Sequence, residues 1–467
     1  MKLVLVYPPG WDSIMPPHGI SSIKSYIKAY SDIEVKCYDL SIELGGRFYS
    51  KKGKKINRYI ANILEYQPEI VGITGLDPTI NNGLVIAKQI KANNRDIKIV
   101  FGGPQASYIG PEIFELSSNV DAVIKGEGEI SFLEYIRANN GGRKKQLING
   151  KSIEKLDEVP YPNFDDYSLD KYVPKILPIT STRGCTRRCT FCGVHANNLF
   201  GPYRERNPRN ILAEIKSDIN KYSVDKFLFT DAVMNSNPKL FRDICITIAD
   251  SNINIKWGTD VLPSIRKKDI RIMSKSGCKF LWISPETGSR KTIKLMNKGV
   301  DLNETRETIK EAHNEGIFTS VWLILGFPGE GRGEIEETLN FARSIHDYAD
   351  ELMFVPFSLM RGSIVYKRPK EYGIDEISCA KGSIWCAFSG KNLIPEEEVI
   401  TSTIDAWEEF DKEGTAYPFL DDYSPEDIES IRETLGESQI SKFEEQIKRL
   451  KGKKPYSYVD IFKKAFD

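Results

Sequence analysis

The chain has 467 residues, 65 of them basic and 65 acidic, so its formal net charge is zero with histidine uncharged. This balance gives no overall basic charge that would favour nucleic-acid binding. The sequence also contains no apolar run of about 18 residues, so no membrane span is predicted. The length suggests about two to four domains.

The first nine residues, MKLVLVYPP, predict a buried strand rather than a signal peptide. The apolar run is shorter than that of a secretion signal, and it ends in two prolines, which suit the end of a strand. A cytoplasmic location is therefore expected.

Residues 1 to 140 alternate between strand and helix patterns. Strands are predicted at 3–7, 34–39, 70–74, 97–101 and 122–125, and helices at 19–30, 58–66, 82–92 and 112–116. Apolar strands separated by helices indicate a doubly wound, Rossmann-like parallel sheet, whose ligands bind beyond the carboxyl ends of the strands. Two glycine-rich turns, GGPQA at 102–106 and GEGE at 126–129, fall at such ends, although tight turns alone would also explain them.

A linker is predicted over residues 141–177, after the turn signal NGGR at 140–143. Prolines 160 and 162 break this segment. We expect it to join two domains.

Three cysteines then follow one another closely: Cys185, Cys189 and Cys192. Thiolates are the usual ligands of iron–sulfur clusters. A zinc site would need a fourth ligand, and no second cysteine pair lies nearby; a disulfide is not expected in a chain without a secretion signal. The other five cysteines are expected to be small buried apolar side chains: Cys37, Cys245, Cys278, Cys379 and Cys386. The expectation is weakest for Cys379 and Cys386, because the fold of their segment is not predicted.

Residues 178–365 repeat the strand–helix pattern six times, which predicts a partial (βα)6 barrel. The strands are expected at 177–182, 226–230, 255–259, 280–283, 319–325 and 352–356. Asp231 follows the second strand, Ser284 and Glu286 the fourth, and Gly326 the fifth. Carboxylates at strand ends face the mouth of a barrel, but helix capping would place them there as well.

The C-terminal region, 366–467, is predicted to be mostly helical, with helices at 396–413 and 425–451. We expect it to cap the barrel mouth and to shape the substrate site. Trp385, Phe388 and Trp407 are expected to pack in a core or to line a cavity.

The cysteine spacing, with Phe191 just before the third cysteine, resembles the radical S-adenosylmethionine (SAM) superfamily. The resemblance implies that Cys185, Cys189 and Cys192 hold one [4Fe–4S] cluster whose open iron chelates SAM. It also implies a set of further SAM contacts: Phe191, Asp231, Ser284, Glu286 and Gly326.

Four stretches of the first domain, PPHGI at 16–20, VGIT at 71–74, FGGP at 101–104 and KGEGE at 125–129, resemble the cobalamin-binding domain of one radical SAM class. The implied cobalamin contacts are Thr74, Leu76, Asp77, Gly102, Gly103, Pro104, Gln105, Gly126, Glu127 and Gly128. Many cobalamin carriers supply a histidine from an Asp-x-His-x-x-Gly motif, but the loop 75–80 has none. We therefore expect the nucleotide base of cobalamin to be displaced, with no histidine on cobalt. Asp77 fits a helix N-cap equally well.

These resemblances imply a cobalamin-dependent radical SAM C-methyltransferase, using methylcobalamin to methylate an unactivated carbon of a peptide, a protein residue or a small precursor. Alternatives are a cyclase, rearrangement or oxidation enzyme with the same cofactors, and a cobalamin-binding sensor or carrier. A monomer with a ferredoxin or flavodoxin as electron donor is expected. The sequence identifies no catalytic side chain and no substrate.

Overall fold

A computed structural model describes residues 1–10, 13–44, 53–76, 79–138, 145–196, 199, 201–414, 453–454 and 456–466. The chain forms two compact units. The first contains Met1–Asp260 with Leu359–Arg368 and Ile377–Phe388, and the second contains Val261–Ser358, Pro369–Glu376 and Ser389–Asp467.

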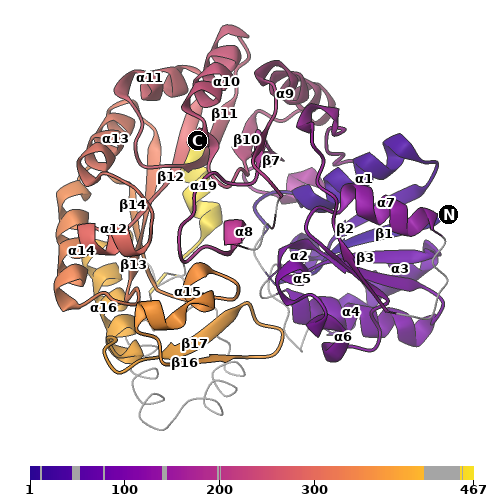
Figure 1. The fold of residues 1–467 in the computed structure, drawn as a ribbon. Helices are drawn as coiled ribbons and strands as arrows, with labels where there is room; N and C mark the ends of the chain where they lie inside the picture. The colour runs from indigo at the N-terminus through magenta and orange to yellow at the C-terminus, as the bar shows by residue number, and fades with distance from the viewer. Residues whose placement is uncertain are drawn as a thin grey trace. The chain divides into compact units, whose positions relative to one another are not determined.

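The first unit begins with a parallel six-stranded sheet of order β2-β1-β3-β4-β5-β6 (Figure 1). Its strands are β1 (Lys2–Tyr7), β2 (Glu34–Asp39), β3 (Ile70–Thr74), β4 (Lys98–Gly102), β5 (Ala122–Lys125) and β6 (Gln146–Asn149). Its helices are α1 (His18–Tyr30), α2 (Leu40–Leu44), α3 (Gly53–Glu65), α4 (Ile80–Asn93), α5 (Gly103–Ile109), α6 (Glu112–Leu116) and α7 (Glu129–Arg137). Helices α1 and α7 cover one face of the sheet, and α3, α4 and α6 lie on the other. The doubly wound sheet predicted from the sequence is confirmed.

Strand β6 was not predicted from the sequence. Its side chains alternate between half-buried and exposed, because it lies at the edge of the sheet. A short, polar edge strand carries no apolar run that would separate it from a loop.

The later part of the first unit contains three parallel strands in the order β7-β10-β11. These are β7 (Ile176–Ile179), β10 (Lys226–Phe229) and β11 (Lys256–Val261), with helices α9 (Pro208–Tyr222) and α10 (Pro238–Asp250) between them. Between β7 and α9 come the cysteine segment, α8 (Gly193–Ala196) and the antiparallel pair β8 (Thr182–Arg183) and β9 (Arg204–Glu205). Asn207 and Asn237 cap α9 and α10, each followed by a proline at the first helical position.

The second unit contains three further parallel strands, β12 (Cys278–Glu286), β13 (Phe318–Leu325) and β14 (Glu351–Pro356). The helices of this unit are α11 (Lys267–Lys275), α12 (Arg290–Leu295), α13 (Leu302–Asn314), α14 (Arg332–Ile345), α16 (Glu396–Phe410) and α19 (Tyr458–Phe466). Helix α16 packs on β14, where Trp407 and Ile404 form a core with Met353. Trp407 is therefore a core residue, one of its two predicted roles.

The remaining elements are β15 (Leu359–Met360), α15 (Ile364–Lys367), β16 (Glu376–Cys379), β17 (Trp385–Ser389) and the 3-10 helices η2 (Leu156–Glu158), η3 (Leu169–Lys171), η4 (Met234–Ser236) and η5 (Pro369–Tyr372). Helices α16 and α19 agree with a largely helical C-terminal region, whereas strands β16 and β17 were not predicted. The helix predicted at 425–451 lies outside the described residues. None of the described helices has the length and apolar character needed to cross a membrane.

The prediction that the five other cysteines are isolated apolar side chains is wrong for two of them. Cys37, Cys245 and Cys278 are buried, as expected, but Cys379 and Cys386 form a disulfide instead of isolated apolar side chains.

Candidate active site

A cavity of about 540 Å³ lies at the carboxyl edge of the first sheet. Its size falls in the usual range for cofactor and ligand pockets. Eight of the ten residues predicted to contact cobalamin line it: Thr74, Leu76, Gly102, Gly103, Pro104, Gly126, Glu127 and Gly128. Asp77 lies outside the described residues. Gln105 is buried elsewhere, and its side-chain amide donates to the carbonyl oxygen of Gly382 at 2.7 Å.

The glycines of this cavity have different roles. A Cβ on Gly102 or Gly126 would meet only one carbonyl oxygen at 3.8 Å, so these two positions leave open space for a ligand. Gly126 also has a positive φ of 83°, which favours glycine. In contrast, a Cβ on Gly103 would lie 2.4 Å from the Thr74 hydroxyl, so Gly103 is needed for packing. Bare backbone facing a large cavity fits a planar cofactor lying across the strand ends.

The same cavity is also lined by the ends of the later strands of this unit. Thr180 follows β7, Arg183 belongs to β8, and Thr230 and Ala232 follow β10. The cavity therefore connects the predicted cobalamin turns with the segment that leads to the cysteines.

A buried ionic network ties these two parts together. The guanidinium of Arg183 contacts Glu129 at 2.6 Å and Glu127 at 3.2 Å, and Arg204 donates to Glu127 at 3.1 Å. Ser22 donates to Glu129 at 3.0 Å. Burial alone would raise the pKa of Glu129, but the charge of Arg183 outweighs burial and holds that pKa below its usual value. Glu129 is therefore a carboxylate, and the network fixes Arg183 two residues before Cys185.

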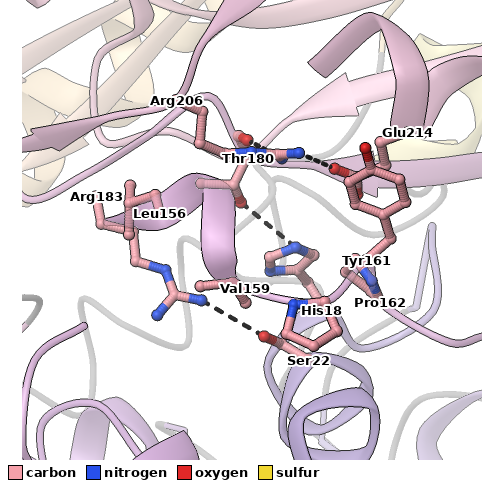
Figure 2. A pocket seen from close by; sticks show the side chains of 11 residues that line it. His18, Ser22, Leu156, Val159, Tyr161, Pro162, Thr180, Arg183, Arg206 and Glu214 are labelled. Atoms are coloured by element: carbon pink, nitrogen blue, oxygen red, sulfur yellow. Dashed lines mark hydrogen bonds and ion pairs between the residues drawn. The ribbon is translucent and has the colours of Figure 1, made fainter. Parts of the chain in front are cut away.

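His18 also lines this cavity, at the start of α1. Its Nε2 lies 3.4 Å from the hydroxyl of Thr180. Burial, reinforced by the charge of Arg183, lowers the pKa of His18 to about 4, so the imidazole is neutral at physiological pH. A second, small cavity of about 20 Å³ is lined by His18, Thr180, Arg183 and Arg206, among others; Figure 2 shows these side chains. It can hold one water molecule.

The cysteine segment itself has a fixed start. Gly184 has a positive φ of 83°, and a Cβ there would lie 2.8 Å from the carbonyl oxygen of Pro202. Cys185, Cys189 and Cys192 all carry thiols. The backbone N–H of Arg187 donates to Cys185 Sγ at 3.4 Å, a contact of the kind that tunes iron–sulfur clusters. Three thiols on one short loop are a suitable donor set for three irons of a cubane.

Asp231 has a clear structural role. One carboxylate oxygen accepts from the Ser181 hydroxyl at 2.9 Å and from the Thr182 hydroxyl at 2.5 Å, and it also accepts from both backbone N–H groups. Burial raises the pKa of Asp231 although these donors oppose the shift. Asp231 thus ties β10 to the segment that leads to Cys185. A contact between Asp231 and SAM stays a prediction.

The remaining predicted SAM residues, Ser284, Glu286 and Gly326, belong to the second unit. Glu286 has a positive φ of 71° and forms an ion pair with Lys298 at 2.5 Å, with both side chains only 10% exposed. Gly326 has a positive φ of 78°, and its N–H donates to Glu330 at 2.7 Å. Lys298 and Glu330 were not predicted as site residues, because a single charged residue in a turn carries no distinctive signal.

Phe191, the remaining predicted SAM contact, is half-buried directly before Cys192. Arg183, Arg204 and Glu129 were also not predicted. Each of them is an ordinary charged residue in the sequence, and their partners lie more than fifty residues away.

Comparison with known proteins gives two family matches. Residues 179–342 match the radical SAM superfamily, and residues 11–136 match the B12-binding domain. The chain is 26% identical over 385 residues to an uncharacterized methyltransferase of Pyrococcus horikoshii, covering 76% of this chain and 81% of the relative. It is 24% identical over 380 residues to the anaerobic magnesium-protoporphyrin IX monomethyl ester cyclase of Rubrivivax gelatinosus, covering 73% and 64%.

The fold is also found in a solved structure. The radical SAM methyltransferase TsrM from Kitasatospora setae, determined with cobalamin and a [4Fe–4S] cluster, matches with a TM-score of 0.69 over 89% of this chain and 90% of that one, at 16% identity. This similarity confirms the predicted fold class. Because residues 11–136 match the B12-binding domain and residues 179–342 match the radical SAM superfamily, the chain combines the two domains found in cobalamin-dependent radical SAM enzymes.

Proposed function

We propose that this enzyme methylates an unactivated carbon. One observation carries the proposal: a single cavity is lined both by the cobalamin-type turns and by the strand ends next to the cysteine segment. When bound, the cluster and SAM supply a carbon-centred radical, and cobalamin supplies the methyl group. A substrate in this cavity would have access to both.

The residues of the chain bind, orient and exclude water. The backbone at Gly102 and Gly126 leaves room for a large planar group. Leu5, Ile73 and Phe132 give the cavity an apolar wall, which favours exclusion of water from reactive species. Neutral His18 offers a hydrogen-bonding group within this wall without adding a charge.

The roles of the predicted site residues follow the same proposal. Cys185, Cys189 and Cys192 would hold the cluster, while Glu286 and Gly326 would contact SAM. The Glu286–Lys298 pair would present a carboxylate of fixed orientation, able to accept the hydroxyls of a ribose.

The finer points about partners are also proposals. We place the enzyme in the cytoplasm as a monomer, reduced by a ferredoxin or flavodoxin, and acting on a small molecule or a peptide.

A second function is ring closure or oxidation without methyl transfer. The similarity to the Rubrivivax cyclase over 380 residues favours keeping it. A cobalamin carrier or sensor is less well supported, because it would not need the cysteine segment.

Mass spectrometry separates these functions. The anaerobically reconstituted enzyme would be incubated with protein-free cell extract, a reductant and SAM bearing a deuterated methyl group. We expect a product that carries the label, together with 5′-deoxyadenosine and S-adenosylhomocysteine in about equal amounts, because each turnover uses SAM in two roles. Deoxyadenosine with an unlabelled product would favour the cyclase function, and no SAM cleavage at all would favour a carrier.

A further inference from the structure

The disulfide between Cys379 and Cys386 lies outside the site described above. It links β16 to β17 across a loop with a sequence separation of 7. Cys386 is buried, whereas Cys379 is half-buried. A disulfide is unusual for a protein expected in a reducing compartment, where such bonds are mostly catalytic or redox-sensing.

On one side, the loop closed by the disulfide is held by the B12-binding domain. The N–H of Gly382 donates to Glu112 at 2.7 Å, and its carbonyl accepts from Gln105 at 2.7 Å. Glu112 also pairs with Arg361 at 2.5 Å. Ile384 is buried in the apolar core beneath helices α4 to α6. The loop is thus seated on the domain that carries the cobalamin turns.

Strand β15, the neighbour of β17, and the residues that follow it contact the cysteine segment. Strand β17 pairs with β15, and Cys386 lies opposite Leu359. A Cβ on Gly193, the residue after Cys192, would lie 2.5 Å from Met360 Sδ. The N–H of Val365 donates to the carbonyl of Thr190 at 3.0 Å. The disulfide is therefore one strand away from the loop predicted to hold the cluster.

We infer that Cys379 and Cys386 form a thiol–disulfide exchange site whose redox state controls how firmly the loop 380–385 is held against the B12-binding domain. The reductant is a dithiol, either a protein or a small molecule. The inference stands on the contacts of this loop and does not depend on the reaction proposed above.

The exchange balances as follows. A thiolate of the reductant attacks the more exposed sulfur, Cys379 Sγ, and Cys386 leaves as a thiolate that takes up a proton. The second thiol of the reductant then attacks the mixed disulfide and releases Cys379 as a thiol. Two electrons and two protons enter the protein, and the reductant becomes a disulfide.

Reduction removes a covalent constraint from a loop that is otherwise held by a few hydrogen bonds, the exposed ion pair between Lys381 and Glu115 at 3.2 Å and one buried side chain. The loop would then detach more often from Gln105 and Glu112. We expect two consequences, which are easier proteolysis at Lys381, within the loop, and weaker binding of cobalamin, because Gln105 lies one residue from Pro104 of the cavity.

The test uses the full-length, cluster-containing protein, equilibrated anaerobically with defined ratios of reduced to oxidised dithiothreitol. Alkylation with iodoacetamide followed by peptide mass spectrometry would report the thiols. We expect Cys379 and Cys386 to become alkylated together at one ratio, with buried Cys245 unmodified throughout. Limited trypsin digestion and titration with hydroxocobalamin would be followed at the same ratios.

The double variant C379S/C386S should behave like the reduced wild type at every ratio, with several-fold faster cleavage at Lys381 and weaker cobalamin binding. The matched control C245S should respond to dithiothreitol as the wild type does. Two results would overturn the inference: thiols at both positions even under fully oxidised dithiothreitol, or a disulfide whose reduction changes neither cleavage nor cobalamin binding.

Discussion

Replacing Arg183 by methionine would test the buried ionic network. Methionine keeps most of the side-chain volume but leaves the Glu129 carboxylate, whose side chain is 6% exposed, without its cation. Removal of one partner from a buried pair costs about 3–5 kcal/mol, because the other charge stays desolvated. Glu127 keeps its contact with Arg204, so Glu129 should account for most of this loss.

The loss should depend on pH in a defined direction. In the wild type, the lowered pKa of Glu129 contributes stability above the unfolded value of about 4.3, and this contribution is lost as the pH falls through the lower folded pKa. In R183M, burial is opposed only by the hydrogen bonds from Ser22 and the backbone, so the pKa of Glu129 should rise relative to the wild type. The difference between wild type and variant should therefore be largest at neutral pH and should shrink as Glu129 becomes protonated.

Urea denaturation of the apoprotein at about pH 5 and about pH 8 would measure this difference. R183M/E129Q should recover part of the loss, because glutamine buries no charge. The control is Lys151→Met, which removes an exposed pair with Glu134 and should cost less than about 1 kcal/mol. A loss in R183M as small as that of the control, or one that does not change with pH, would refute the reasoning.

Four further predictions concern the cofactors. Cys189→Ala should abolish the broad absorbance near roughly 400 nm expected for a thiolate-ligated cluster and all SAM cleavage, whereas Cys245→Ala should keep both; normal iron content in the first variant would contradict the assignment. Electron paramagnetic resonance of the cob(II)alamin form should show no nitrogen splitting, and a splitting that disappears in His18→Gln would show that His18 ligates cobalt. Glu286→Gln should weaken SAM binding by about 1.5–3 kcal/mol, measured by equilibrium titration, and an unchanged SAM affinity would remove Glu286 from the SAM site. Asp231→Asn should reduce the cluster content, because it loosens the segment before Cys185, and a full cluster content would contradict this role.

The features that the sequence predicts well are local ones. Three such features are the cysteine spacing, the glycine turns at 102 and 126, and the apolar strands. Each of them is formed by residues that are close together in the sequence, so a short-range pattern reveals it. The pairing of Arg183 with Glu129 spans 54 residues, and no local pattern encodes it. The two roles open to Asp231 could not be separated from the sequence, because they differ only in which donors surround its carboxylate.

The disulfide shows another limit. Cys379 and Cys386 were expected to be isolated because compartment and spacing were the only guides. Their pairing depends on β16 and β17, two strands of only four and five residues, which were not predicted from the sequence. The side chain of Gln105 was likewise placed in the cobalamin site by its neighbours, whereas the Gly382 carbonyl draws it into a different contact.

The discontinuity of the first unit has a consequence for biosynthesis. Its main part ends at Asp260, but its last segment ends at Phe388, roughly 130 residues later. At about 5–20 residues per second of synthesis, this gap corresponds to a delay on the order of ten seconds. During that time the cysteine segment would already have left the ribosome, but its contacts with Met360 and Val365 would not yet have formed. Delivery of iron and sulfide to the nascent chain would therefore meet an incompletely supported loop, and cluster insertion is expected to follow chain release.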